Sequence, residues 1–381
     1  MEPAEPKLNT SRIALWLILF AVIVAGGFAI TKQKETKAIT LGAILPLTGS
    51  GADQAEWIKR GFELALENSK SNIKIVYEDS GGDTQKALSA YKKLREQFVI
   101  PAVLTWGSGI GIALTPLVNE DKVIQMGVAT AANAYGTPND FTFRNFPKAA
   151  QEADFISSAV LGALNTKDIT ILKINNDYGK SSADSFKEQF VQKGGRVAAE
   201  EVFAPNTTDF RTHLAKLKSL SPKLIYLATY PKEGGLLIKQ ARELGLSSRF
   251  IASVAILGGK EFFDIAGGAA EGLVVVTSMP PFSATSEDIA ISDFVEKYRK
   301  KYGENPEPQQ LYTARAYDAL KILETALKLC NADTACLRDE LFKVQNYKGV
   351  GGTFSFDRNG DVSAEFNLQQ VKNGQFVPLA K

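Results

Sequence analysis

Apolar and polar residues follow two alternating patterns along this chain. Short apolar runs, such as residues 39–45, 73–77 and 224–228, are typical of buried strands. Longer segments, such as residues 54–68 and 233–244, place apolar residues three or four positions apart, as amphipathic helices do. This alternation of strands and helices predicts parallel sheets that are covered by helices on both faces.

The alternation occurs twice. Residues 39–130 form one series, and a second series of helices and strands extends from residue 149 to residue 254. A further apolar run at residues 272–277 precedes three predicted helices between residues 286 and 344. Because the second series repeats the architecture of the first, we predict two α/β lobes of similar design.

Residues 103–130 combine a strand, a Gly/Ser loop, a helix and a second strand. A right-handed crossover between parallel strands places Ser108 and Thr130 at the same edge of a sheet. Small residues at that edge let a ligand approach the backbone, and free N–H groups at a helix start favour a carboxylate or phosphate. We interpret this stretch as half of an anion-binding site.

Two other interpretations of the loop at residues 107–111 remain open at this point. The loop resembles the start of a nucleotide-binding site, although it is one residue short of the GxGxxG spacing. That interpretation requires an acidic residue for the ribose after the next strand, where residues 127–130 read Gly-Val-Ala-Thr. A purely structural turn is the second alternative, since such glycines are common in α/β sheets.

Composition and net charge argue against several classes of function. The chain has 381 residues, 45% of them hydrophobic, which is enough for a large core, and a formal net charge of +2, which is too small to suggest nucleic acid. Its single histidine, His213, has no second His or Cys nearby and no nucleophile motif around it. We therefore expect no metal site, no cofactor and no enzymatic activity.

Cys330 and Cys336 are six positions apart, at the end of one predicted helix and the start of the next. Turn-forming residues lie between them, so a local disulfide is expected, and a pair of free thiols in a cytosolic protein is the alternative. The choice depends on the compartment.

Residues 13–30 are apolar or small and carry no charge. As a helix they would span about 27 Å, enough to cross a membrane. We expect a retained membrane anchor, with a signal peptide cleaved near residues 27–29 as the alternative. Residues 1–12 would then form a cytoplasmic tail, residues 31–37 a linker, and residues 38–381 a domain outside the cytoplasm.

Several segments, in this order and spacing, resemble the type I periplasmic solute-binding proteins of ABC importers, specifically the leucine/isoleucine/valine-binding group. The resemblance covers about residues 38–381. The segments that carry it are GAILPLTGSGA (42–52), RGFELALEN (60–68), TWGSG (105–109), GVATAA (127–132), NNDYGKS (175–181), LIYLATY (224–230), AEGLVV (270–275) and GVGGTFSFDRNGD (349–361).

The resemblance implies a monomer with two lobes that close on a ligand, joined by three hinge crossings near Asn145, Thr277 and Gly352. The first lobe would contain residues 38–145 and 278–351, and the second lobe residues 146–277 and 352–381. The implied partners are a small-molecule ligand and the subunits of an ABC permease.

The resemblance also implies which residues contact the ligand. The first lobe would bind a ligand carboxylate, and two tyrosines of the second lobe would cover it. Gln54 occupies the position of an aromatic lid residue, for which Trp57 is a possible substitute, and Phe282 would line the side-chain pocket. The complete set is Ser108, the backbone of Val128, Thr130, Tyr178, Tyr230, Gln54, Trp57 and Phe282.

The chain departs from the family pattern at one position. Amino-acid binders of this group carry a carboxylate after the strand that matches residues 250–254, where it pairs with the ligand ammonium. Val254 stands here instead. An unpaired buried ammonium costs several kcal/mol, so either another acid replaces the missing one or the ligand has no ammonium. The candidate replacements are Asp53, Glu56, Asp177 and Glu233.

We therefore predict an extracytoplasmic, membrane-associated receptor that binds an amino acid, or a related small carboxylate or amide, and delivers it to an ABC permease. No chemistry is expected, since specificity would come from closing two lobes around a solute. The sensor domain of a signalling system is one alternative. An α/β enzyme that uses the Gly107 loop for a nucleotide or phosphate is a weaker one.

Overall fold

The computed structural model describes residues 38–49, 51–67, 69, 71–257, 261–279, 286–306 and 311–379. The expected anchor at residues 13–30, the flanking segments 1–12 and 31–37, and Phe282 lie outside the described residues. Among the residues that are described, no helix has the length and apolar character needed to cross a membrane. The elements below belong to one unit, Ile39–Lys381.

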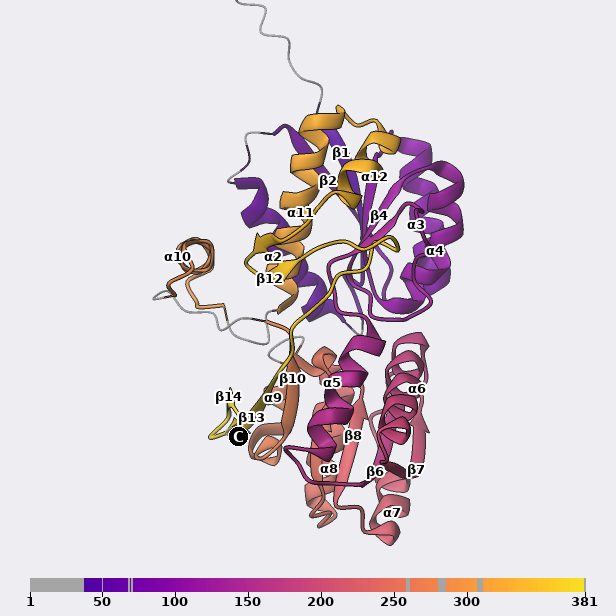
Figure 1. Ribbon diagram of the computed structural model, residues 1–381, viewed down its shortest axis with the longest axis vertical. Helices are drawn as coiled ribbons and strands as arrows, with labels where there is room; N and C mark the ends of the chain where they lie inside the picture. The colour runs from indigo at the N-terminus through magenta and orange to yellow at the C-terminus, as the bar shows by residue number, and fades with distance from the viewer. Residues whose placement is uncertain are drawn as a thin grey trace, which may run out of the picture. The chain divides into compact units, whose positions relative to one another are not determined.

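The first sheet has five parallel strands in the order β2-β1-β3-β4-β5 (Figure 1). Every residue of the central strand β3 is buried, because helices cover both faces of the sheet. The strands are β1 (Ile39–Leu45), β2 (Ile73–Asp79), β3 (Ala102–Trp106), β4 (Ile124–Ala129) and β5 (Thr142–Arg144). The helices that alternate with them are α2 (Ala52–Glu67), α3 (Thr84–Gln97) and α4 (Ser108–Asp121).

The second sheet has seven strands in the order β14-β13-β10-β9-β8-β6-β7, of which β13 and β14 pair antiparallel at one edge. Its strands are β6 (Asp168–Ile174), β7 (Arg196–Phe203), β8 (Leu224–Ala228), β9 (Arg249–Ala252), β10 (Val274–Thr277), β13 (Asn367–Lys372) and β14 (Gln375–Pro378). Its helices are α5 (Ala149–Leu161), α6 (Asp177–Gln192), α7 (Arg211–Leu220), α8 (Pro231–Glu243) and α9 (Glu261–Ala266), with 3₁₀ turns at Val254–Leu257 and Gly267–Ala270.

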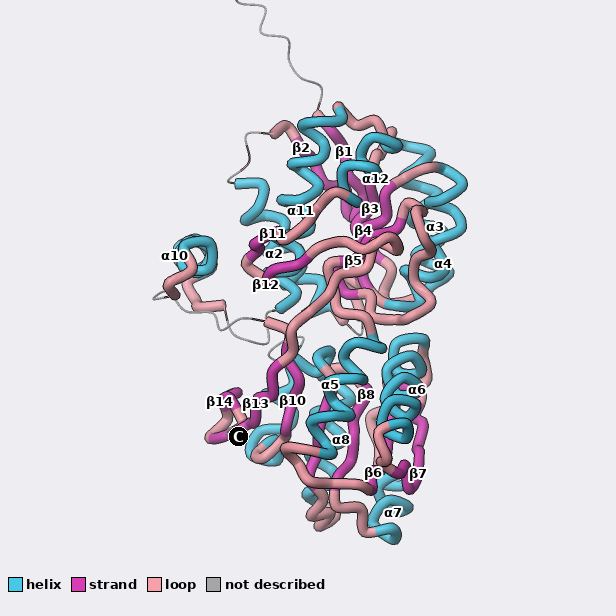
Figure 2. The backbone as a smooth tube through the Cα atoms, in the orientation of Figure 1, coloured by secondary structure: helices cyan, strands magenta, loops and turns pink. Residues whose placement is uncertain are grey.

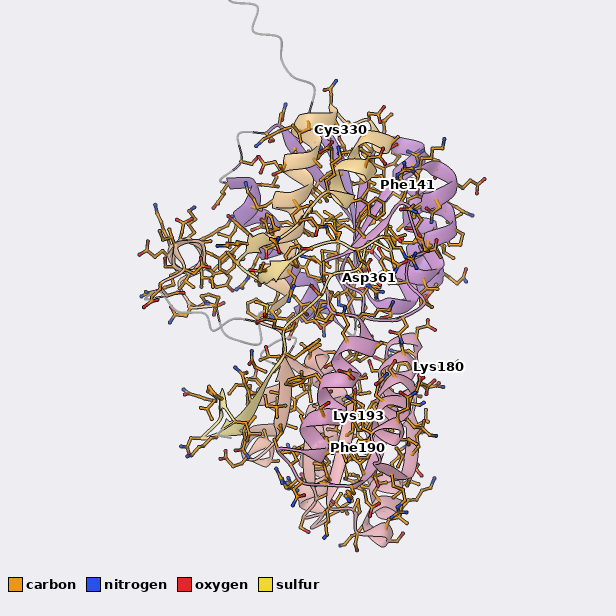
Figure 3. All side chains as sticks on the ribbon, in the orientation of Figure 1. Phe141, Lys180, Phe190, Lys193, Cys330 and Asp361 are labelled. Atoms are coloured by element: carbon orange, nitrogen blue, oxygen red, sulfur yellow. A yellow bond between two sulfur atoms is a disulfide. The ribbon has the colours of Figure 1, made fainter. Side chains whose placement is uncertain are left out.

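Of the three later helices, α11 and α12, drawn in orange in Figure 1, pack against β4 of the first sheet, and α10 contacts α2 through hydrogen bonds to Arg60 and Glu67. The three helices are α10 (Ile289–Tyr302), α11 (Leu311–Cys330) and α12 (Thr334–Phe342). A Cβ at Gly61 of α2 would lie 2.2 Å from the carbonyl oxygen of Thr313, so glycine is what lets α2 and α11 pack this closely. A disulfide joins Cys330 to Cys336 where α11 ends and α12 begins (Figure 3).

Two buried charged residues of α11 hold the segments that connect the two sheets. The Arg315 guanidinium donates to the carbonyl oxygens of Asn145 (2.9 Å) and Ser278 (3.0 Å). The Asp318 carboxylate accepts hydrogen bonds from the backbone N–H groups of residues 350 and 351, at 3.0 and 2.7 Å. One helix therefore binds two connecting segments through Arg315 and the turn at residues 350–351 through Asp318.

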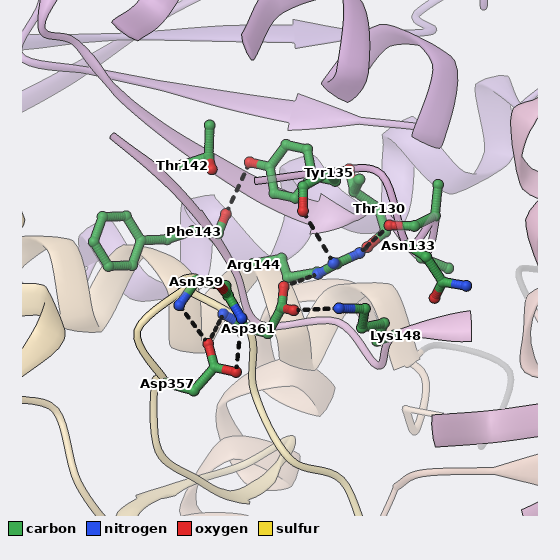
Figure 4. A network of polar contacts seen from close by, with 12 residues as sticks. Thr130, Asn133, Tyr135, Thr142, Phe143, Arg144, Lys148, Asp357, Asn359 and Asp361 are labelled. Carbon is green, nitrogen blue, oxygen red and sulfur yellow. Dashed lines mark hydrogen bonds and ion pairs between the residues drawn. The ribbon is translucent and has the colours of Figure 1, made fainter. Parts of the chain in front are cut away.

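The third connection between the lobes was expected near Gly352. The hairpin of β11 (Tyr347–Gly349) and β12 (Gly352–Phe354) leads into a turn that contacts β5 of the first sheet (Figure 2). There the Arg144 N–H donates to the Gly360 carbonyl oxygen (2.9 Å), and its guanidinium pairs with Asp361 (2.7 Å), as Figure 4 shows. We therefore propose that the chain crosses between the lobes at residues 362–366 rather than at Gly352.

Glu324 of α11 connects this helix to the loop between α2 and β2. Its side chain is 3% exposed and accepts hydrogen bonds from the hydroxyls of Ser69 and Ser71, both at 2.7 Å. It also pairs with the ammonium groups of Lys321 (2.6 Å) and Lys328 (2.7 Å). Burial alone raises the pKa of Glu324, but these hydrogen bonds outweigh burial and lower the pKa to about 2.

We expect Glu324→Gln to lower the free energy of unfolding by about 1–2 kcal/mol at pH 7, because the charged hydrogen bonds are lost. A lowered folded-state pKa stabilises the fold above the unfolded value of 4.5, and this contribution disappears as the pH falls toward 2. Urea unfolding at pH 7 and pH 3 should therefore show a smaller difference between variant and parent at pH 3. Glu296→Gln, at an exposed position of α10, is the control. An equal difference at both pH values would contradict this account.

Candidate functional site

A cavity of about 170 Å³ lies where the carboxyl ends of strands from both sheets meet the first turns of α4 and α6. Ligands in parallel α/β sheets bind at this edge, because the strand ends and helix N-termini converge there. The lining residues used below are Trp106, Ser108 and Gly109 from the first lobe, and Asp177, Tyr178 and Tyr230 from the second.

Ser108 begins α4 directly after Gly107, whose φ of +90° is a conformation that suits glycine. The Ser108 side chain is buried, and its hydroxyl oxygen accepts hydrogen bonds from the N–H groups of Ala131 (3.3 Å) and Ala132 (3.1 Å). It thereby fixes the loop after β4 against the start of α4. The first turn of α4 leaves N–H groups without helical partners, which suits an anion.

The other two residues expected in this half of the site lie deeper. Thr130 is fully buried, and its hydroxyl donates to the Gly107 carbonyl oxygen at 3.4 Å. Val128 is buried in β4. The structure therefore brings Ser108, Val128 and Thr130 to one sheet edge, and of these three only Ser108 is among the described residues that line the cavity.

Three aromatic rings form one wall of the cavity. Tyr178, in the first turn of α6, stacks on Tyr230 with the ring centres 5.1 Å apart and the planes 19° apart. The ring centre of Trp106, the last residue of β3, lies 5.8 Å from that of Tyr230. Because Trp106 belongs to the first lobe and the tyrosines to the second, the rings connect the two lobes.

Trp106 was missed in the sequence, where Gln54 and Trp57 were expected near the ligand. The Gln54 side chain is buried and accepts a hydrogen bond from the Trp106 indole N–H at 2.6 Å, so it orients the tryptophan. The Trp57 ring instead packs under the Arg60 guanidinium, 4.6 Å away, and is not among the described residues that line this cavity. The sequence feature that could have identified Trp106 as a site residue is its position, one residue before the Gly/Ser loop.

Gly109 allows the two lobes to approach closely. A Cβ at Gly109 would lie 2.8 Å from a carboxylate oxygen of Asp177, the first residue of α6. Any side chain at this position would therefore require that carboxylate to move. The Asp177 carboxylate also lies near the N-terminus of α4, where the helix dipole favours negative charge.

The region around Val254 contains an acid that sequence reasoning did not identify. Glu152, in the first turn of α5, is 2% exposed and accepts a hydrogen bond from the Val254 N–H at 2.6 Å. Burial raises the pKa of Glu152 to about 7, although the Val254 N–H partly opposes this effect. Glu152 precedes Val254 by about a hundred residues, so no local pattern relates the two positions.

The four acids that the sequence offered as candidates take other positions. Asp53 and Glu56 lie in α2, and Asp177 lies against Gly109. Glu233 is buried in the first turn of α8, where it accepts a hydrogen bond from the Asn206 N–H at 3.1 Å. Among the described residues, the acid hydrogen-bonded to the Val254 amide is therefore none of these four but Glu152.

Residues 38–375 match the family model of periplasmic binding proteins. The chain therefore belongs to this family of solute-binding proteins, which are not enzymes. The predicted two-lobed α/β fold and the predicted family are both confirmed.

Individual relatives agree with this membership. The Leu/Ile/Val-binding protein homolog 3 of Brucella melitensis is 25% identical over 377 residues, which cover 95% of this chain and 98% of that protein. The crystal structure of the leucine binding protein LivK from Thermotoga maritima has a TM-score of 0.82 at 25% identity and covers 90% of this chain and 98% of its own.

A more distant solved structure shares the fold alone. The solute-binding protein of an ABC transporter from R. palustris, in complex with benzoate, has a TM-score of 0.80 at 21% identity and covers 90% of this chain and 95% of its own. Proteins with this fold therefore include one solved with an acid that carries no ammonium.

We expect Ser108→Ala to lower the free energy of unfolding by about 1–3 kcal/mol, because the backbone N–H groups of residues 131 and 132 lose their buried acceptor. Ser89→Ala is the matched control. The Ser89 hydroxyl is exposed and donates to the Gln85 carbonyl oxygen, so its loss should change the unfolding free energy by less than about 0.5 kcal/mol. Denaturant unfolding of the ligand-free protein measures the change in unfolding free energy for both variants. Equal changes would show that the buried Ser108 hydrogen bonds stabilise the fold no more than the exposed Ser89 hydrogen bond does.

Proposed function

We propose that this protein is the extracytoplasmic receptor of an ABC importer, which binds an amino acid or a related small carboxylate between its lobes and delivers it to the permease. The observation that carries the proposal is the cavity itself. An anion-binding helix start at Ser108 lines the same cavity as three aromatic rings, of which Trp106 comes from the first lobe with Ser108 and the two tyrosines from the second. Relatives named for leucine, isoleucine and valine binding support the choice of ligand class.

In this proposal the first lobe binds the ligand carboxylate through the Ser108 hydroxyl and the free N–H groups of α4. The backbone of Val128 and the hydroxyl of Thr130 complete the carboxylate site when the ligand displaces part of the present packing. Tyr178 and Tyr230 cover the ligand from the second lobe, and Trp106 takes the lid position that was assigned to Gln54 or Trp57. Phe282 remains a proposed contact of the ligand side chain.

We also propose that residues 38–381 lie outside the cytoplasm, with residues 13–30 as a membrane anchor or signal peptide. The disulfide between Cys330 and Cys336 supports this location, because disulfides persist in oxidising compartments and are rare in the cytosol. A formal net charge of +2 fits a receptor for small solutes rather than for nucleic acid.

The proposal is tested by a thermal-shift screen of the purified full-length chain against the common amino acids and against aliphatic and aromatic carboxylates and amides. A ligand at about a thousand times its Kd adds roughly 4 kcal/mol to the stability of the folded state. At least one carboxylate ligand should raise the melting temperature in a saturable way, without being consumed. If no carboxylate or amide does so, the proposed function is wrong.

We expect Tyr230→Ala to raise the Kd of the ligand found in this screen by about 10- to 100-fold, because the central ring of the aromatic wall is lost. Tyr230→Phe keeps the ring and removes only the hydroxyl, so its Kd should stay within about 5-fold of the parent value. Titration calorimetry measures both constants. A Kd for Tyr230→Ala equal to that of the parent would remove Tyr230 from the binding site.

A further inference from the structure

Glu152 is a buried acid without a cationic partner. Its carboxylate is 2% exposed, and the hydrogen bond recorded for it comes from the Val254 N–H. Two other buried acids are paired with cations: Asp361 binds Arg144 and Lys148, and Glu324 binds two lysines. Among the described residues, no lysine or arginine forms an ion pair with Glu152 or affects its ionisation.

The surroundings of Glu152 adjoin the cavity. The Tyr178 hydroxyl forms a short hydrogen bond with the Ser253 hydroxyl, one residue before the Val254 amide that donates to Glu152. The Glu152 carboxylate raises the pKa of three tyrosines, in each case after the larger effect of burial: Tyr178, which lines the cavity, Tyr226 of β8 and Tyr312 of α11. The acid is therefore close to groups from both lobes.

A buried carboxylate that has no cationic partner is unfavourable in free energy. Removing a carboxylate from water costs several kcal/mol unless a cation and hydrogen bonds replace the lost hydration. The charge of Glu152 acts on three tyrosines, and the faces of aromatic rings also attract cations. The buried Glu152 carboxylate therefore lacks one positively charged partner.

We propose that the ligand supplies this charge, and that Glu152 binds an ammonium group of a ligand whose carboxylate lies at the start of α4. The ligand class is then an amino acid in its zwitterionic form, and Glu152 is the residue that distinguishes it from an ammonium-free acid. This inference rests on the proposed function, since it assumes that the ligand occupies the cavity between the lobes. It also answers the question raised by Val254, because the acid comes from α5 instead of from the end of β9.

Glu233 is the rival for this role. It is also buried, and its second carboxylate oxygen has no hydrogen-bond partner among the described residues. Its charge acts on Tyr230, in the second lobe, whereas the charge of Glu152 also acts on Tyr312 of α11. A ligand held between two lobes is contacted from both sides, so Glu152 is the better placed of the two.

The test compares Glu152→Gln with Glu233→Gln in the full-length protein. Glutamine keeps the size of the side chain and an oxygen that can accept the Val254 N–H, but it removes the charge. Titration calorimetry measures Kd for each of the twenty common amino acids and, for those that bind, for the 2-oxo acid of the same skeleton. We expect Glu152→Gln to raise the Kd of the amino acid at least 100-fold and to change that of the 2-oxo acid less than about 3-fold. Glu233→Gln should change both less than about 3-fold.

The outcomes separate the two proposals. If the parent protein binds only ammonium-free acids, or if Glu152→Gln binds the amino acid as the parent does, this inference is overturned while the proposed function stands. If only Glu233→Gln loses amino-acid binding, Glu233 rather than Glu152 binds the ammonium group, and this inference is also overturned. If the parent binds no carboxylate at all, the proposed function itself fails.

A second variant covers the case in which Glu152→Gln does not fold, as judged by its melting temperature. Glu152→Asp keeps the charge and withdraws it by one methylene. It should raise the Kd of the amino acid about 10-fold and leave the 2-oxo acid unaffected. An equal effect on both ligands would show that position 152 acts only through packing, which would overturn the inference.

Discussion

The arrangement of the two lobes depends on charges that α11 places in the interior. Arg315 donates to carbonyl oxygens of two connecting segments, and Asp318 accepts from two amides of the turn between β11 and β12. Burial lowers the pKa of Arg315 to about 10 and raises that of Asp318 to about 7, which measures the cost of keeping both groups away from water. Apolar side chains could not satisfy these backbone groups, because connecting segments leave them without sheet partners.

Sequence patterns were sufficient for the fold and for part of the site. Buried strands followed by amphipathic helices define parallel sheets, and parallel sheets place their functional loops at the carboxyl edge. This geometry predicted the position of Ser108, and the resemblance to the solute-binding family implied that Tyr178 and Tyr230 would lie opposite it. The three residues, which lie far apart in the chain, do line one cavity.

The remaining features depend on contacts that no local pattern encodes. In the sequence, Trp106 has only the features of an ordinary strand residue. Its hydrogen bond to Gln54 and its ring contact with Tyr230 are what place it at the cavity. The position that we propose for the third crossing rests on the pairing of Arg144 with Asp361, which are separated by 217 positions. Glu152 meets Val254 only because α5 and the end of β9 pack together. In each case a long-range polar contact, rather than hydrophobic periodicity, decides where the residue acts.

The binding site and the lobe connections share neighbouring residues. Tyr312 and Arg315 lie three positions apart on α11, so they project from the same side of the helix. The Tyr312 ring stacks on Phe146, 5.7 Å away, directly after the Asn145 carbonyl that Arg315 binds. Glu152 follows within the first turn of α5. A hinge rotates its lobes about such connecting residues, so groups beside them move least. An acid beside the hinge can contact a ligand in the open state of the protein, and the geometry of that contact stays the same when the lobes close.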